Sequence, residues 1–181
     1  MGINISGSLL EYNNSGIRIT HNSLVGVDTN ASGFVSHTNK PNFFAYRSTA
    51  GETFSGWNYM TLNTTLSNVG SCFNTSTGYF TAPVTGIYYF TYCAYGYKYA
   101  ATSDSYVHPL LAVNGSTVVR KASNTTDYRL RARTYYASTY AFDLQINDAL
   151  YLTAADFVQP YLYFGQTGLL YHQQLTGFYV E

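Results

Sequence analysis

Residues 86–94 read GIYYFTYCA, and this stretch decides the fold. Its even-numbered aromatic positions are Tyr88, Phe90 and Tyr92. Successive side chains of a β-strand point to opposite faces, so these three rings share one face. The other face is apolar as well, because it takes Ile87, Tyr89 and Cys93. A strand that is apolar on both faces is typical of the inside of a sandwich or of a subunit interface.

The composition extends this interpretation to the whole chain. Aromatic residues make up 18% of the 181 residues, and charged residues only 10%. Tyr, Phe and Thr favour half-buried strands, and no long 3.6-residue period is present, so we expect an all-β domain with few helices. The aromatic content exceeds what a lone monomer needs, which indicates contacts between subunits.

The charge balance argues against several classes of function. The formal net charge is zero, whereas general nucleic-acid binding needs an excess of Lys and Arg. No apolar run is long enough to span a bilayer, and residues 1–10 lack the basic start and apolar core of a secretory signal. The two cysteines, Cys72 and Cys93, allow either one disulfide or two separate buried thiols.

Short strands separated by turn residues are expected on both sides of residues 86–94. Further expected strands cover residues 43–47, 78–82, 128–135, 161–164 and 169–180. Asn114-Gly115 predicts a tight hairpin, because both turn positions need positive φ. A second hairpin is expected around Asn147-Asp148, joining residues 140–146 to 149–155.

The N-terminal part of the chain has a different composition. Residues 1–40 are rich in Asn, Ser, Thr and Gly, with short strand-like pieces such as residues 16–20. We interpret this segment as an extended arm or anchor. Lys40-Pro41 marks the expected boundary, and the second domain is expected to cover residues 41–181.

Residues 62–92 resemble the signature of the complement C1q globular-head domain. That signature places an Asn and several aromatic residues at fixed offsets and ends in a Gly-x-Tyr-x-Phe-x-aromatic run. The matching positions here are Asn68, Phe73, Phe80, Gly86, Tyr88, Phe90 and Tyr92. Leu62 departs from the pattern, which has Phe there. Further matching pieces follow in family order, so the resemblance covers residues 41–181.

The resemblance implies a two-sheet antiparallel jelly-roll sandwich of the tumour-necrosis-factor-like superfamily, assembling as a homotrimer. Enzymatic signals are weak, since no nucleophile elbow, phosphate-binding loop or His-Glu-x-x-His motif is present, and we expect no catalytic residue. Several family members bind calcium through Asp side chains. The corresponding candidates are Asp104, Asp127 and residues 124–126, but Thr134 or Tyr135 stands where some relatives have a ligand Asp. We therefore expect no cofactor, with calcium as the alternative.

Two groups of residues are candidate binding sites. The first group is Arg129, Arg131 and Arg133. These residues alternate along one expected strand, so their guanidinium groups would form a ladder able to bind carboxylates, sulfates or phosphates, or else a solvated outer strand. The second group is Tyr95, Tyr97 and Tyr99. Tyr side chains are suited to recognition of proteins and sugars, and equally to a subunit contact.

Three hypotheses for function follow. The first is a trimeric head on a virion surface, as a fibre tip, head fibre or capsid decoration, which residues 1–40 join to a larger viral assembly. This head would bind a host-surface glycan or protein, or would stabilise the particle. The second is a secreted, extracellular C1q-like or lectin-like protein that recognises glycans or protein partners. The third, an enzyme, has no motif in its favour.

Overall fold

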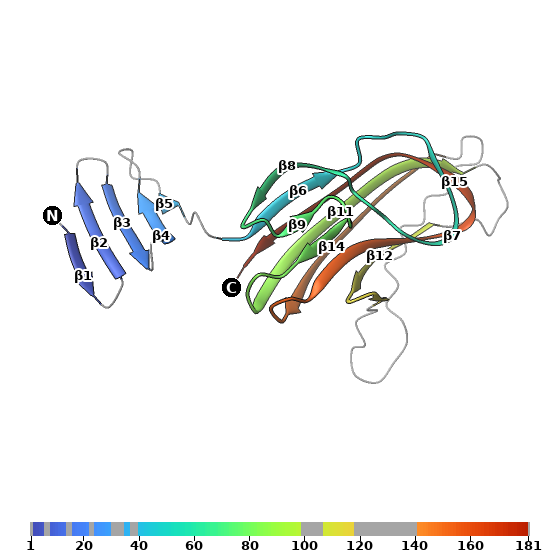
Figure 1. Ribbon diagram of the computed structural model, residues 1–181. Coiled ribbons are helices and arrows are strands. Elements are labelled where there is room, and N and C mark those ends of the chain that lie inside the picture. The colour runs from blue at the N-terminus through green and yellow to red at the C-terminus, as the bar shows by residue number, and fades with distance from the viewer. Residues whose placement is uncertain are drawn as a thin grey trace. The chain divides into compact units, whose positions relative to one another are not determined.

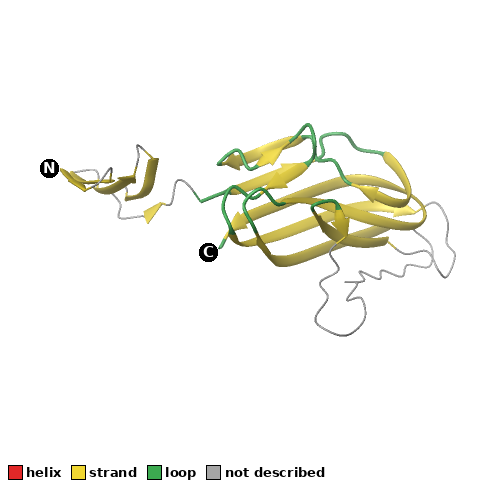
Figure 2. Cartoon of the chain, turned by 60° about the horizontal axis from the view of Figure 1, so that its bottom comes forward, coloured by secondary structure: helices red, strands yellow, loops and turns green. Residues whose placement is uncertain are grey.

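The computed structural model describes residues 2–5, 8–13, 16–21, 24–29, 35–36, 40–98, 107–117 and 141–180. All regular elements within these ranges are strands, and their pairings are antiparallel (Figures 1 and 2). The prediction of an all-β fold is therefore confirmed. The chain divides into two units, Met1–Pro41 and Asn42–Glu181, which are described separately.

The first unit is a five-stranded sheet in which each strand pairs with its neighbours along the chain. Its strands are β1 (Gly2–Ile5), β2 (Ser8–Asn13), β3 (Gly16–His21), β4 (Leu24–Thr29) and β5 (Val35–Ser36). The expected strand at residues 16–20 lies within β3. The segment interpreted as an arm thus contains a sheet of its own.

The second unit is named the head below. Its strands are β6 (Asn42–Tyr46), β7 (Glu52–Tyr59), β8 (Thr64–Val69), β9 (Phe73–Asn74), β10 (Tyr79–Thr81), β11 (Gly86–Lys98), β12 (Val107–Val113), β13 (Ser116–Thr117), β14 (Ala141–Leu152) and β15 (Phe157–Tyr179). The expected strands around residues 43–47, 78–82 and 86–94 are confirmed. The strand expected at residues 128–135 lies outside the described residues.

The strands of the head form two layers that share β15. The C-terminal part of β15 pairs with β6 and β11, which in turn pair with β8 and β14. The N-terminal part of β15 pairs with β7, β10 and β12. β7 pairs with β15 on both sides of a register shift between Phe164 and Gly168. Residues 168–170 of β15 pair with β7 and with β11, so this strand joins the two layers (Figure 1).

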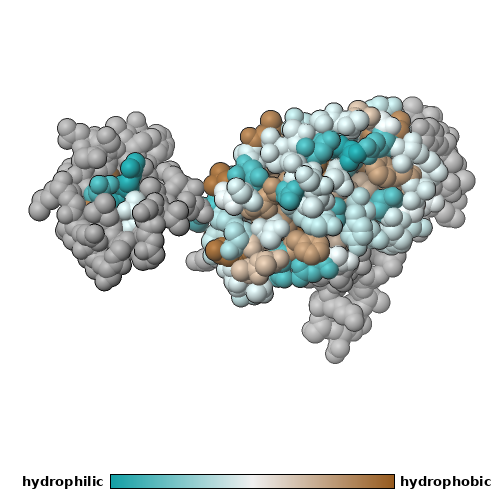
Figure 3. Space-filling model, viewed as in Figure 1, coloured by the Kyte–Doolittle hydropathy of each residue, from teal (hydrophilic) through white to brown (hydrophobic). Residues whose placement is uncertain are grey.

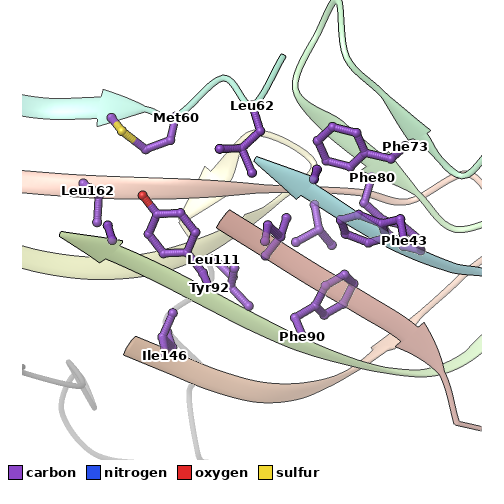
Figure 4. Packing of buried hydrophobic residues seen from close by; sticks show 14 of the residues in the cluster. Phe43, Met60, Leu62, Phe73, Phe80, Phe90, Tyr92, Leu111, Ile146 and Leu162 are labelled. Carbon is purple, nitrogen blue, oxygen red and sulfur yellow. The ribbon is translucent and has the colours of Figure 1, made fainter. Parts of the chain in front are cut away.

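The core lies between the layers and combines aromatic rings with aliphatic side chains (Figure 4). Tyr88, Phe90 and Tyr92 are fully buried on one face of β11, as the alternation predicts. Phe80 packs against three rings, with centroid distances of 5.3 Å to Phe43 and 5.1 Å to Phe90 and Tyr88. Such edge-to-face and offset pairs stabilise a core beyond the area that they bury.

The hairpin at Asn114-Gly115 is confirmed. Both residues have positive φ, 53° and 70°, and the turn joins β12 to β13. Asn tolerates this left-handed conformation better than other residues with a side chain, and Gly adopts it without steric cost.

The prediction of a hairpin around Asn147-Asp148 is wrong. β14 runs unbroken through both residues, because Asn147 pairs with Thr91 and Asp148 with Phe90 along β11. Twelve consecutive residue pairs with β11 outweigh the turn preference of two residues. Residues 161–164 and 169–180, expected as separate strands, likewise lie in the single strand β15, apart from Val180.

Candidate recognition surfaces

A tyrosine surface lies on the outer face of the layer that contains β11. It consists of Tyr95 and Tyr97 from β11 and Tyr171 from β15, all exposed. Tyr95 Oη donates a hydrogen bond to Tyr97 Oη at 2.7 Å, and the Tyr171 ring centroid lies 5.4 Å from that of Tyr97. The hydrogen bond to Tyr97, followed by desolvation, raises the pKa of Tyr95. Tyr95 therefore stays neutral and presents a hydroxyl beside an aromatic ring at physiological pH.

A glycine in β11 makes this arrangement possible. A Cβ atom at Gly96 would lie 2.2 Å from the carbonyl oxygen of Leu169, so only glycine allows β15 to approach here. The β11–β15 register shifts at this point: Tyr95 pairs with His172, and Gly96 with Leu170. Tyr171 is the residue of β15 at which this register shift occurs. Its ring packs beside those of Tyr95 and Tyr97 on the outer face.

An apolar strip occupies the opposite end of the same outer face. It consists of Ile87, Tyr151 and Phe178, with Tyr151 69% and Phe178 50% exposed. Ile87 pairs with Tyr151 across β11 and β14, and the Phe178 ring lies 5.5 Å from the ring of Tyr89. Figure 3 shows that apolar patches interrupt the hydrophilic surface of the head. Exposed aromatic groups of this size are typical of interaction sites.

A third aromatic group lies on the other layer and was not predicted from the sequence. This Trp57 surface consists of Trp57 and Tyr59 from β7 with Tyr161 and Tyr163 from β15. The Trp57 ring stacks on that of Tyr161 at 5.0 Å, and lies 4.6 Å from that of Tyr163. Tyr59 Oη donates a hydrogen bond to the carbonyl oxygen of Gly115 at 2.7 Å. Burial, and then the neighbouring Tyr59, raise the pKa of Tyr161, so the Tyr161 hydroxyl is uncharged at neutral pH.

The alternation of residues gives a partial signal for the Trp57 surface. Trp57 and Tyr59 are two residues apart, as are Tyr161 and Tyr163, so each pair shares one side of its strand. The pairing of β7 with β15 brings the two pairs together, with Tyr59 opposite Tyr161 and Trp57 opposite Tyr163. No local pattern specifies a pairing between segments so far apart in the chain.

The residues of the C1q-like signature lie in the head's interior or support it. Asn68 Nδ2 donates to the carbonyl oxygen of Phe73 at 2.8 Å, and Asn68 Oδ1 accepts from the Phe73 N–H at 3.0 Å. Asn68 thus joins the end of β8 to β9 by two hydrogen bonds. Phe73, Phe80, Tyr88, Phe90 and Tyr92 are buried in the core, and Gly86 begins β11. Leu62, the position that departs from the pattern, is also fully buried.

Several predicted site residues lie outside the described ranges. They are Arg129, Arg131, Arg133, Tyr99 and the calcium candidates Asp104, Asp127 and residues 124–126. Among the described residues, no group of three or more His, Cys, Asp or Glu could hold a metal ion. The same residues include no helix able to cross a membrane.

Both cysteines of the head are unpaired. Cys72 is buried between β8 and β9, where its Sγ lies 3.4 Å from the carbonyl oxygen of Val69. Burial raises the pKa of the Cys72 thiol to about 11, so this thiol is protonated at neutral pH. Cys93 is partly buried, and desolvation raises the pKa of its thiol as well. Neither group is a reactive thiolate.

Comparisons with known proteins give a family and a fold. The model of the C1q domain family matches residues 42–174. The globular domain of the zebrafish complement 1qA protein superposes with a TM-score of 0.54 at 19% identity, covering 78% of this chain and 98% of that one. The Eiger TNF of S. frugiperda superposes with a TM-score of 0.53 at 12% identity, covering 78% and 94%. A search of curated proteins finds no match.

Proposed function

Because the chain belongs to the C1q domain family, we propose that its head works as a non-enzymatic recognition module that assembles as a homotrimer. Domains of the C1q and TNF-like type are typically trimeric modules of this kind. The observation that carries the proposal is the outer face of β11, β14 and β15, where the apolar strip and the tyrosine surface are exposed. A trimer would bury side chains that a monomer leaves in water.

The apolar strip is the first candidate for the contact between copies. Its members are large, aliphatic or aromatic, and lie on adjacent strands, so a different surface of a neighbouring copy could cover them together. Burial of side chains of this size contributes about 1.5–3 kcal/mol each. A heterologous ring contact repeats this gain at each of three interfaces in a closed trimer.

Light scattering of the full chain tests the assembly. We expect a species of three times 20.1 kDa for the wild type. Tyr151→Ser combined with Phe178→Ser should shift the mass toward the monomer, because two exposed rings of the strip are lost. Leu66→Ser is the matched control, since Leu66 is 72% exposed and lies on β8, a strand that contributes no residue to the strip. A wild-type monomer would refute the trimeric head.

Recognition by the assembled head would use the aromatic surfaces that the trimer leaves exposed. The Trp57 surface combines stacked rings with Tyr hydroxyls and carries no formal charge, which suits a neutral glycan or a protein loop. Tyr95 and Tyr97 have two alternative roles, ligand binding and subunit contact. Replacing both by Ser distinguishes them: lost ligand binding with an intact trimer mass supports recognition, and a reduced mass supports the subunit contact.

At a finer level, we propose that this head belongs to a virion surface, as a fibre tip, head fibre or capsid decoration. The first unit, Met1–Pro41, would then join the head to the particle. C1q domain proteins are commonly extracellular, and a secreted recognition protein is the alternative. An antibody against the head distinguishes the two sources. Labelling of purified particles supports the virion, and detection only as a free protein in the medium supports secretion.

A further inference from the structure

The two faces of the N-terminal sheet differ in chemistry. The backbone register places Leu10 of β2 opposite Ile19 of β3, so these two apolar side chains are neighbours. Residues directly opposite each other in antiparallel strands share one face of the sheet. Ile17, two residues before Ile19 on β3, lies on that same face. Leu10, Ile17 and Ile19 are each more than 40% exposed.

The other face carries a pair of opposite charges. The register places Glu11 of β2 opposite Arg18 of β3. This pair is compatible with water, because each charge has an oppositely charged neighbour. The described side chains of this face, Glu11, Arg18 and Thr20, are therefore polar, whereas those of the opposite face, Leu10, Ile17 and Ile19, are apolar.

The N-terminal unit contains one layer of strands among its described residues. A sheet with an apolar face is stable when another layer covers that face, because a single layer leaves its apolar side chains in water. Further copies of the chain would supply this second layer if their apolar faces packed against one another. The exposed side chains of this face, Leu10, Ile17 and Ile19, are uncharged and aliphatic. They offer no hydrogen bond or opposite charge to a nucleic acid or an ionic ligand.

We propose that this apolar face is covered by the same face of further copies of the chain, so that Met1–Pro41 is a second self-association element. The inference rests in part on the proposed trimeric head, which would bring several N-terminal units together. Six residue steps separate Ser36, the end of β5, from Asn42, the start of β6, and they reach about 20 Å at most. Such a tether keeps the units at an effective concentration of about millimolar.

The identity of the partner follows from this tether and from the symmetry of the assembly. Each copy presents the same aliphatic side chains, so three copies around one axis direct three matching surfaces toward that axis. Ile19 lies on β3, the central strand of the five, and would therefore be near the middle of the contact.

The first experiment measures the mass of the full chain over a range of concentrations. In the Tyr151→Ser, Phe178→Ser background, adding Leu10→Ser, Ile17→Ser and Ile19→Ser should raise the midpoint concentration of association at least about tenfold. The matched control is Arg18→Ser with Thr20→Ser, on the charged face, which should leave the midpoint unchanged. An equal midpoint with and without the three apolar changes overturns the proposal.

This design distinguishes failure of the contact proposed for the head from failure of the contact proposed for the N-terminal sheet. If the head variants leave the mass unchanged while the N-terminal variants lower it, the contact proposed for the head is wrong and the N-terminal contact stands. If only the head variants lower the mass, the N-terminal contact is wrong. Circular dichroism of each variant shows whether the strands have formed.

A second variant tests the contact without removing apolar surface. Ile19→Cys and Arg18→Cys are adjacent on β3 and lie on opposite faces. Under mild oxidation, Ile19→Cys should form disulfide-linked dimers and Arg18→Cys should not, with both native cysteines replaced by Ser in each chain. Equal cross-linking of the two variants, or none in Ile19→Cys, overturns the proposal.

Discussion

Asn114 and Asp156 join two turns of the head through their side chains. Asn114 Nδ2 donates a hydrogen bond to Asp156 Oδ1 at 2.7 Å, and Asn114 Oδ1 accepts one from the Phe157 N–H at 2.9 Å. Asp156 Oδ2 accepts a third from the Thr153 N–H at 2.7 Å. The hydrogen bond from Asn114, followed by that from Thr153, lowers the pKa of Asp156. The ionised carboxylate thus fixes the Asn114-Gly115 turn against residues 153–156.

We expect the stabilisation by Asp156 to be lost in acid. A carboxyl group whose folded pKa lies below its unfolded value, about 3.9, stabilises the fold above that value. The contribution disappears as the pH falls through the lower folded pKa. Because the side chain is partly exposed, solvent screening limits the effect to about 1 kcal/mol. The measurement is the free energy of unfolding of wild type and Asp156→Asn between about pH 6 and about pH 2. A difference that stays constant over this range would contradict the assignment.

Phe80→Ala should destabilise the head by about 3–5 kcal/mol. Phe80 is fully buried and packs against Phe43, Tyr88 and Phe90, so truncation leaves a cavity that these rings fill only in part. Chemical denaturation followed by far-ultraviolet circular dichroism measures the change. Leu66→Ala is the control, because Leu66 is 72% exposed and its loss should cost no more than about 0.5 kcal/mol. Similar losses in both variants would argue against the described core.

Tyr92 and Gln173 should show a coupling energy in a double-mutant cycle. Tyr92 Oη donates a buried hydrogen bond to Gln173 Oε1 at 3.0 Å. Tyr92→Phe alone leaves the Gln173 oxygen without this donor, at a cost of about 1–3 kcal/mol. Combining it with Gln173→Leu should cost less than the sum of the single changes, because both polar groups are then removed together. Additive losses would show that the two side chains do not interact.

The arginine ladder predicted from the sequence is tested by replacing Arg129, Arg131 and Arg133 with Ala. If the ladder binds anions, affinity for a sulfated glycan at low salt should fall at least about tenfold, because charge-assisted hydrogen bonds are lost. The trimer mass should remain. Arg18→Ala with Lys40→Ala is the charge control outside the head. Unchanged binding in the triple variant would assign the ladder to a solvated outer strand.

Local patterns in the sequence predict much of the fold. Period-two aromatic residues place Tyr88, Phe90 and Tyr92 in the core, and Asn114-Gly115 predicts its hairpin, because both features depend on residues close together in the chain. Asn147-Asp148 has the same turn character and yet lies within β14. Pairing with β11, which no local pattern encodes, decides its conformation.

The candidate surfaces are predictable only in part for the same reason. Tyr95 and Tyr97 are recognisable from their alternation, but Tyr171 joins them through the register shift opposite Gly96. The Trp57 surface depends on the pairing of β7 with β15. The amphipathic N-terminal sheet could be read from alternation in β2 and β3 once their register is known, and its strand-like pieces alone give no register.

The position of β15 in both layers has a consequence for how the head acquires its structure. Five strands pair with β15, and all of them precede it in the chain. During synthesis, β7 and β10 are made before β15. The edges of β7 and β10 that pair with β15 are therefore exposed to other chains until β15 has been made. Pairing between such distant segments makes for slow folding and exposes newly made chains to aggregation. Expression at reduced temperature, which slows synthesis and aggregation together, should favour the soluble head.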